Sequence, residues 1–131
     1  MAHSSASAQL CNFNAHAIVD QAVNYTTVGG RFSPTIGIDL ASQVVILSVT
    51  GANSLRLSLP ASSFRKTGLG GYVASVIQNL SRTEILLQPL SRGDWAYSVG
   101  IEGFVPGSTP VTVSLMIGSQ TGRAIVEPYV V

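Results

Sequence analysis

Apolar and polar residues alternate along two stretches in the C-terminal third of the chain. Residues 95–102 (WAYSVGIE) and 111–118 (VTVSLMIG) each place an apolar side chain at nearly every second position. A period of two, rich in β-branched and aromatic residues, is typical of half-buried β-strands. Residues 103–110 between them are rich in Gly and Pro, which predicts a loop. We therefore expect residues 95–122 to form two strands of one sheet, against which the rest of the fold packs.

Shorter segments upstream also have the character of strands. Residues 43–50 (QVVILSVT) are apolar almost throughout, which is typical of a strand buried on both faces. Residues 54–59 (SLRLSL) point three leucines inward, and Pro60 ends that strand. Further strands are predicted at residues 23–32, 72–78, 82–88 and 123–131, with a bulge or bend at Gly29-Gly30.

The number and spacing of these segments predict the fold class. We count eight or nine strands, spaced by about 8–12 residues, and no strong helix. This spacing is typical of an all-β antiparallel sandwich, of immunoglobulin-like or jelly-roll-like type. The length of 131 residues suits one domain, and no linker divides the chain.

Residues 10–23 (LCNFNAHAIVDQAV) fit neither period well. Leu10, Phe13 and Ala17 begin a helical stripe, but Asp20 interrupts it. The alternation expected of a strand is also imperfect. We predict that residues 1–22 form a flexible, extended arm and that residues 23–131 form the single sandwich domain.

The composition suggests that the protein associates with itself or with other proteins. Apolar residues make up 46% of the chain and charged residues only 10%, where about 25% is usual. Such a chain is expected to cover apolar surface in an assembly. The net charge is +1 and the basic residues are scattered, except for Arg65-Lys66, which argues against nucleic-acid binding. No apolar run approaches the roughly 18 residues of a membrane span, and the N-terminus lacks the features of an intact signal peptide.

Candidate catalytic and metal-binding residues are few and dispersed. His3, Cys11 and His16 are too few, and lie in too irregular a segment, for a metal site or a Cys/His nucleophile pair. No two carboxylates are close in sequence; they are Asp20, Asp39, Glu84, Asp94, Glu102 and Glu127. We expect Asp39 and Asp94 to be turn residues. The sequence therefore predicts no catalytic residue, metal or cofactor, and a protein that is not an enzyme.

Three surface features leave alternatives open. Cys11, the single cysteine, either is a small apolar residue of the arm or bridges two chains. Residues 92–94 spell Arg-Gly-Asp, which is an adhesion tripeptide as well as ordinary turn chemistry. Four aromatic residues, Trp95, Tyr97, Tyr72 and Tyr25, form either a sugar-stacking platform or part of the core. For Trp95 and Tyr97 we favour the core.

One stretch resembles a known module. Residues 109–122 (TPVTVSLMIGSQTG) are similar to a strand of the form N-P-V-T-V-x-L-x-I-G-D-D-x-G, which recurs in large secreted and cell-surface bacterial proteins. Features upstream occur in the same order: Gly30-Arg31-Phe32, the run from Leu55 to Lys66, and Gly93-Asp94-Trp95. The resemblance covers residues 28–126 and implies a β-rich spacer or display module without assigned activity. Ser119-Gln120 stands where the module has the Asp-Asp pair after Ile-Gly. The resemblance therefore implies that a cation held by that pair in relatives is not bound here.

Together these observations predict a non-enzymatic structural or interaction module of a secreted or cell-surface protein. We expect it to act through protein contacts or self-assembly, with the N-terminal arm adding as a strand to an exposed sheet edge of a neighbour. Its expected partners are other copies of the chain or neighbouring surface domains. The alternatives are a carbohydrate-binding module and a capsid- or filament-type assembly subunit.

Overall fold

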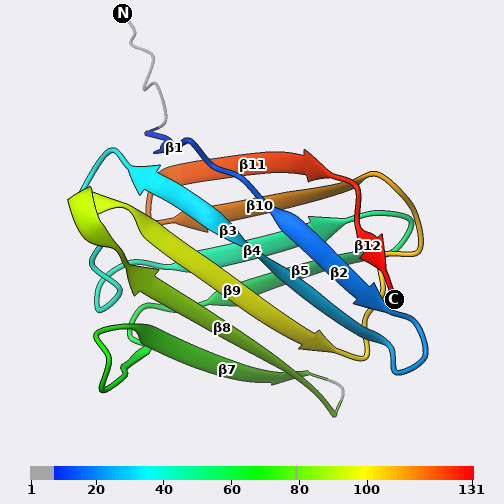
Figure 1. The fold of residues 1–131 in the computed structure, drawn as a ribbon. Helices are drawn as coiled ribbons and strands as arrows, with labels where there is room; N and C mark the ends of the chain where they lie inside the picture. Colours follow the sequence, from blue (N-terminus) through cyan, green and yellow to red (C-terminus); the bar gives the residue numbers. More distant parts are fainter. Residues whose placement is uncertain (1–7, 79) are drawn as a thin grey trace, which may run out of the picture.

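The computed structural model describes residues 8–78 and 80–131 and consists of two facing β-sheets (Figure 1). The larger sheet has the order β12-β2-β3-β9-β8-β7-β6, with β1 also paired to β3. Its strands are β1 (Leu10–Cys11), β2 (His16–Asp20), β3 (Tyr25–Pro34), β6 (Arg65–Lys66), β7 (Tyr72–Gln78), β8 (Ser81–Pro89), β9 (Trp95–Glu102) and β12 (Tyr129–Val130). The smaller sheet has the order β11-β10-β4-β5. Its strands are β4 (Val45–Thr50), β5 (Ser54–Leu59), β10 (Val111–Ile117) and β11 (Gln120–Val126).

This architecture confirms the prediction of an almost entirely β, mostly antiparallel, sandwich-like fold. The described residues contain twelve strands rather than eight or nine, and a single 3-10 turn, η1 (Ser91–Gly93). Three of the strands, β1, β6 and β12, are only two residues long. A segment of two residues shows no period, so hydrophobic alternation does not reveal it.

The core lies between the sheets and is built from alternate residues of the strands. Leu47, Val99 and Leu115 are completely buried, and Leu57 and Leu59 of β5 point inward as predicted. Full burial of one such side chain contributes about 1.5–3 kcal/mol to stability. The prediction that residues 43–50 are buried on both faces, or nearly so, is wrong. In the described structure no element packs on the outer face of β4, so only every second residue is buried.

The two alternating stretches that prompted the fold prediction belong to different sheets. β9 pairs with β3 and β8, whereas β10 pairs with β4 and β11. Residues 103–110 cross from one sheet to the other (Figure 1). Facing sheets are about 10 Å apart, a distance that eight residues easily span. Alternation places a strand against the core, but it does not say on which side of the core the strand lies.

The described part of the expected N-terminal arm is built into the fold, which corrects that prediction. β2 pairs with β3 along its whole length, and Ala17 and Val19 are buried in alternation with exposed neighbours. β1 pairs with β3, while Gln9 bridges to Thr121 of β11 in the smaller sheet. This segment therefore closes one side of the sandwich (Figure 1). His3 lies outside the described residues.

Gly29 and Gly30 lie in a regular ladder with β9, so the predicted bulge is not formed. At Gly30 the absence of a side chain allows another backbone segment to approach closely. Asn14 lies against Gly30, and its backbone N–H donates to the carbonyl oxygen of Arg31 at 3.1 Å. The Asn14 side-chain oxygen accepts from the Arg31 N–H at 3.0 Å. Glycine at this position leaves room for the segment that links β1 to β2.

Tyr97 joins this segment to the core. Its ring stacks on Phe13 with a centroid separation of 5.3 Å, and its hydroxyl donates to the Asn14 carbonyl oxygen at 2.8 Å. Burial raises the pKa of the Tyr97 phenol well above its ordinary value of about 10. The folded state therefore holds this proton more tightly than the unfolded chain. The resulting stabilisation is complete below about pH 10 and is lost as the pH rises from there toward the raised folded-state pKa.

We expect Tyr97→Phe to reduce the alkaline loss of stability, because a phenylalanine ring cannot ionise. At pH 8 the variant should lose about 1 kcal/mol through the missing hydrogen bond. Above about pH 10 its free energy of unfolding should decline less steeply than that of the unmodified protein. Urea denaturation at several pH values measures both effects, with Tyr25→Phe at an exposed position as control. Parallel pH profiles for Tyr97→Phe and the unmodified protein would contradict this assignment.

Candidate functional site

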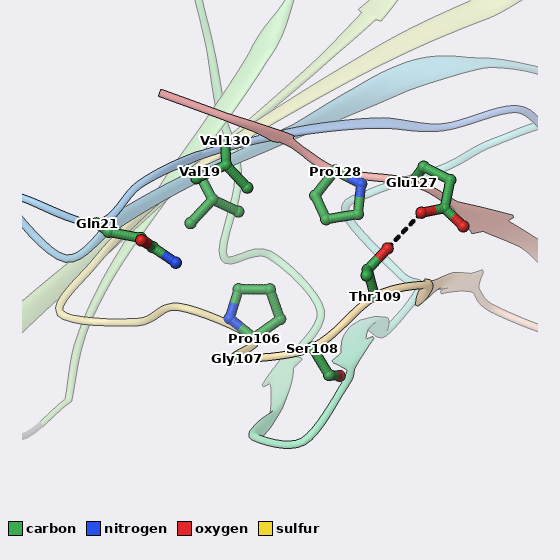
Figure 2. A pocket seen from close by; sticks show the side chains of 9 residues that line it. All are labelled: Val19, Gln21, Pro106, Gly107, Ser108, Thr109, Glu127, Pro128 and Val130. Atoms are coloured by element: carbon green, nitrogen blue, oxygen red, sulfur yellow. Dashed lines mark hydrogen bonds between the residues drawn. The ribbon is translucent and has the colours of Figure 1, made fainter.

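One hollow lies at the end of the sandwich where residues 103–110 enter the smaller sheet. It has a volume of about 320 Å³ and is bounded by the end of β2, this loop and the turn between β11 and β12 (Figure 2). Its lining residues are Val19, Gln21, Pro106, Gly107, Ser108, Thr109, Glu127, Pro128 and Val130. Figure 2 shows the rings of Pro106 and Pro128 on opposite sides, with the Thr109–Glu127 contact at one end.

The polar groups of this hollow hold the loops in place. The Thr109 hydroxyl donates to the carboxylate of Glu127, the only charged side chain of the lining. The Ser108 hydroxyl accepts from the Ala52 N–H at 2.7 Å and so ties the loop to the turn between β4 and β5. The lining has no histidine, cysteine or second carboxylate. It therefore lacks a histidine or thiol for a Ser–His or Cys–His type of pair, and it contains no set of ligands for a metal.

The candidate metal and thiol residues do not come together. His16 is exposed on β2, and Cys11 is exposed on β1, with its sulfur 3.6 Å from the hydroxyl oxygen of Thr35. In residues 8–78 and 80–131, no group of three or more His, Cys, Asp or Glu side chains is placed to hold a metal ion.

The acidic residues serve local structure. Glu84 pairs with Arg82 at 3.1 Å, and Glu102 accepts a hydrogen bond from the Arg82 backbone N–H. Asp39 accepts from the Ala41 N–H and the Ser42 hydroxyl, as expected of a turn residue. Asp94, at the end of η1, accepts from the Ser33 hydroxyl at 2.7 Å. The aspartate of the Arg-Gly-Asp tripeptide is thus engaged within the protein.

The four aromatic candidates do not share an exposed face. Tyr97 is buried, and Trp95 packs against the core while stacking on Tyr72 at a centroid separation of 6.0 Å. Tyr25 alone lies on the outer face of the larger sheet, where its hydroxyl lies over Gly100 of β9. The core interpretation of Trp95 and Tyr97 is confirmed, and a platform of four rings is not formed.

Gln120 is a structural residue that the sequence analysis did not recognise. Ser119 is exposed, but Gln120 is only 1% exposed. Its side-chain oxygen accepts from the N–H groups of Thr35 and Ile36 at 2.7 and 3.0 Å, and its amide donates to the Ile36 carbonyl oxygen at 2.9 Å. The sequence indicates this burial only through position: Gln120 and Gly122 are two residues apart, and both lie on the inward-facing side of β11.

The strand edges of the two sheets differ in how they are protected. β11 is partly covered, because the Thr121 N–H donates to the Ala8 carbonyl oxygen. β5 and β11 each carry an exposed arginine near the middle, Arg56 and Arg123 respectively. Charged side chains on an edge discourage pairing with another strand. Both outer strands of the smaller sheet therefore have some protection.

β7, near one end of the larger sheet, carries no charged residue of its own. On its side away from β8, the described chain provides a partner only for Tyr72 and Val73, through the short strand β6. Residues 74–78 (ASVIQ) carry no charge and leave this edge unpaired. Ile77 is 72% exposed, and Leu80 at the adjacent hairpin is 99% exposed. This open apolar edge, the β7 edge, is the strongest candidate interaction site.

No family model matches the chain, and no significant match was found among curated proteins or solved structures. No helix in the described part of the chain is long and apolar enough to span a membrane.

Proposed function

We propose that the protein is a non-enzymatic structural or interaction module of a secreted or cell-surface protein, and that it acts through protein contacts by strand addition at the β7 edge. The observation that carries this proposal is the unpaired, uncharged stretch of β7 with Ile77 and Leu80 exposed beside it. The free N–H and C=O groups of such an edge are a template for another strand.

The partner is a second copy of the chain or a neighbouring surface domain. Residues 10–20 are not available as the donated strand without disrupting this fold, because β1 and β2 already pair with β3. Antiparallel pairing of two β7 edges needs no such segment and joins the larger sheets of two copies into one. A capsid- or filament-type subunit with jelly-roll-like topology is a variant of the same proposal, since it also depends on contacts between copies.

Replacing Ile77 with lysine should weaken self-association by at least about tenfold, because it places a charge at the edge and removes exposed apolar surface. Light scattering coupled to size-exclusion chromatography over a range of concentrations measures the effect. Ile125→Lys is the matched control, because Ile125 is 65% exposed on β11 of the other sheet. An unmodified protein that is monomeric at every concentration would contradict self-assembly, as would equal weakening by the control.

A further inference from the structure

The outer face of the smaller sheet carries a row of four polar side chains that crosses all four strands. In the ladder, Arg56 of β5 pairs with Ser48 of β4, Ser48 with Ser114 of β10, and Ser114 with Arg123 of β11. The inward neighbours of these residues are buried or half-buried, so the row itself projects from the sheet. Adjacent strands lie about 4.8 Å apart, which places the Cα atoms of the two arginines roughly 14 Å apart.

The four strands of this sheet carry positive charge without negative charge. None of the six carboxylates of the chain lies on β4, β5, β10 or β11. The one ion pair among the described residues is Arg82–Glu84, on the larger sheet. Arg56 and Arg123 are both exposed, and within that part of the chain neither is neutralised by a neighbour. The outer face of the larger sheet is different, because Glu84 and Glu102 lie there beside Arg82.

Hydroxyl side chains are the most frequent on the remainder of the face, which also carries Ile46, Met116 and the exposed Ile125. Ser48 and Ser114 occupy the centre of the row, and neither hydroxyl takes part in a side-chain hydrogen bond within the described structure. Further hydroxyl side chains project around them from the same strands: Thr50, Ser54, Ser58, Thr112 and Thr121. No aromatic side chain lies on these strands, so the face offers no platform for stacking nucleic-acid bases.

One end of the row opens into a hollow between β11 and the segment around β1. Arg123 lines this hollow of about 440 Å³, together with Gln9, Cys11, Asn12 and Thr121. Arg123 is the only charged residue of the lining. A charged substituent of a ligand that lies along the row therefore has space beside the guanidinium group.

We propose that the Arg56–Ser48–Ser114–Arg123 row binds an acidic polysaccharide, a polymer that bears carboxylate or sulfate groups among hydroxyl groups. Each guanidinium group donates paired hydrogen bonds to one anionic group of the polymer. The two serine hydroxyls exchange hydrogen bonds with sugar hydroxyls between these anchors. The ligand crosses the four strands, which carry no aromatic residue, so its binding depends on charge and hydroxyl contacts rather than on aromatic stacking. This site is separate from the β7 edge and does not depend on the function proposed above.

The two arginines also lie on edge strands, where a charge alone protects against strand pairing. The two roles predict different results. Edge protection requires only that Arg56 and Arg123 repel another strand, and it gives no role to Ser48 and Ser114. Binding of a polysaccharide uses all four side chains and is weakened by salt.

The test compares the unmodified protein with Arg56→Ser/Arg123→Ser and with the matched control Arg65→Ser/Lys66→Ser, which removes the same charge from β6. Calorimetric titration at low and at moderate ionic strength uses polygalacturonate, dextran sulfate and uncharged dextran. We expect binding to one or both acidic polymers and none to dextran. The row variant should bind at least about tenfold more weakly, and the control within about twofold of the unmodified protein. Ser48→Ala/Ser114→Ala should weaken binding by about threefold at unchanged net charge.

Several results would overturn the proposal. Equal losses in the row variant and the control would show that only net charge matters. Equally tight binding of polyglutamate would exclude a preference for polysaccharide, and absence of binding to both acidic polymers would exclude the site. Increased self-association of the row variant with unchanged polymer binding would assign the arginines to edge protection alone. Thermal unfolding followed by circular dichroism verifies that each variant is folded.

Discussion

A Gly30→Ala variant is expected to lose about 3 kcal/mol of folding free energy, because a methyl group at this position overlaps the carbonyl oxygen of Asn14. The obstacle is backbone rather than the end of a flexible side chain. Accommodation of the methyl group requires displacement of the segment between β1 and β2. That displacement strains or breaks the two hydrogen bonds between Asn14 and Arg31 and the bond from Tyr97.

Urea denaturation at neutral pH measures this loss. Gly37→Ala is the control, since a Cβ atom there meets no other atom within 4 Å. It should leave stability within about 0.5 kcal/mol of the unmodified protein. If Gly30→Ala proved as stable as the control, Asn14 would not be held firmly against β3.

Gln120→Ala is expected to cost about 2–3 kcal/mol, because one side chain satisfies three backbone groups of the segment that follows β3. The N–H groups of Thr35 and Ile36 and the carbonyl group of Ile36 would lose their partners together. Gln120→Glu should also be destabilising, since it replaces the amide donor with an oxygen that faces the Ile36 carbonyl group.

Chemical denaturation of both Gln120 variants tests this prediction, with Ser119→Ala at the exposed neighbouring position as control. Hydrogen exchange adds a local measurement, because the amides of Thr35 and Ile36 should lose protection in Gln120→Ala before the centre of β3 does. A loss below about 0.5 kcal/mol would mean that water replaces all three hydrogen bonds.

Local alternation was sufficient to predict most of the strands. Leu57 and Leu59 point inward from β5, and Tyr97, Val99 and Ile101 do so from β9, as their spacing indicates. Alternation reports only that one face of a strand meets apolar surface. The assignment of β9 and β10 to opposite sheets depends on the path of the loop between them, which has no periodic pattern.

The N-terminal segment shows where tertiary contacts decide the structure. β1 is two residues long, and its place is determined by pairing with β3 and by the bridge from Gln9 to Thr121. Leu10 is buried only because both sheets are already present beside it. A glycine within a strand pattern marks Gly30 as unusual, but the cause, close approach of Asn14, involves a residue 16 positions away in the sequence.

The candidate sites depended still more on the assembled fold. The β7 edge is unpaired because β6 is short, and the sequence of β7 alone does not reveal its neighbours. The row across the smaller sheet joins residues from four strands and requires the register of every ladder. Gln120 lies in the predicted family motif, yet its hydrogen bonds reach a segment about 85 positions away. The resemblance to a secreted bacterial module stays a prediction.

A β-sheet contacts partners in two perpendicular directions, through backbone groups at its edge and through side chains on its face. Backbone hydrogen bonds leave the β7 edge within the plane of the sheet, whereas the side chains of the Arg56–Arg123 row leave the other sheet along its normal. A polymer held on the face therefore does not block the edge. Copies bound along one polymer chain would be confined at a high effective concentration. Lateral pairing at the β7 edge would then organise the bound copies into a layer.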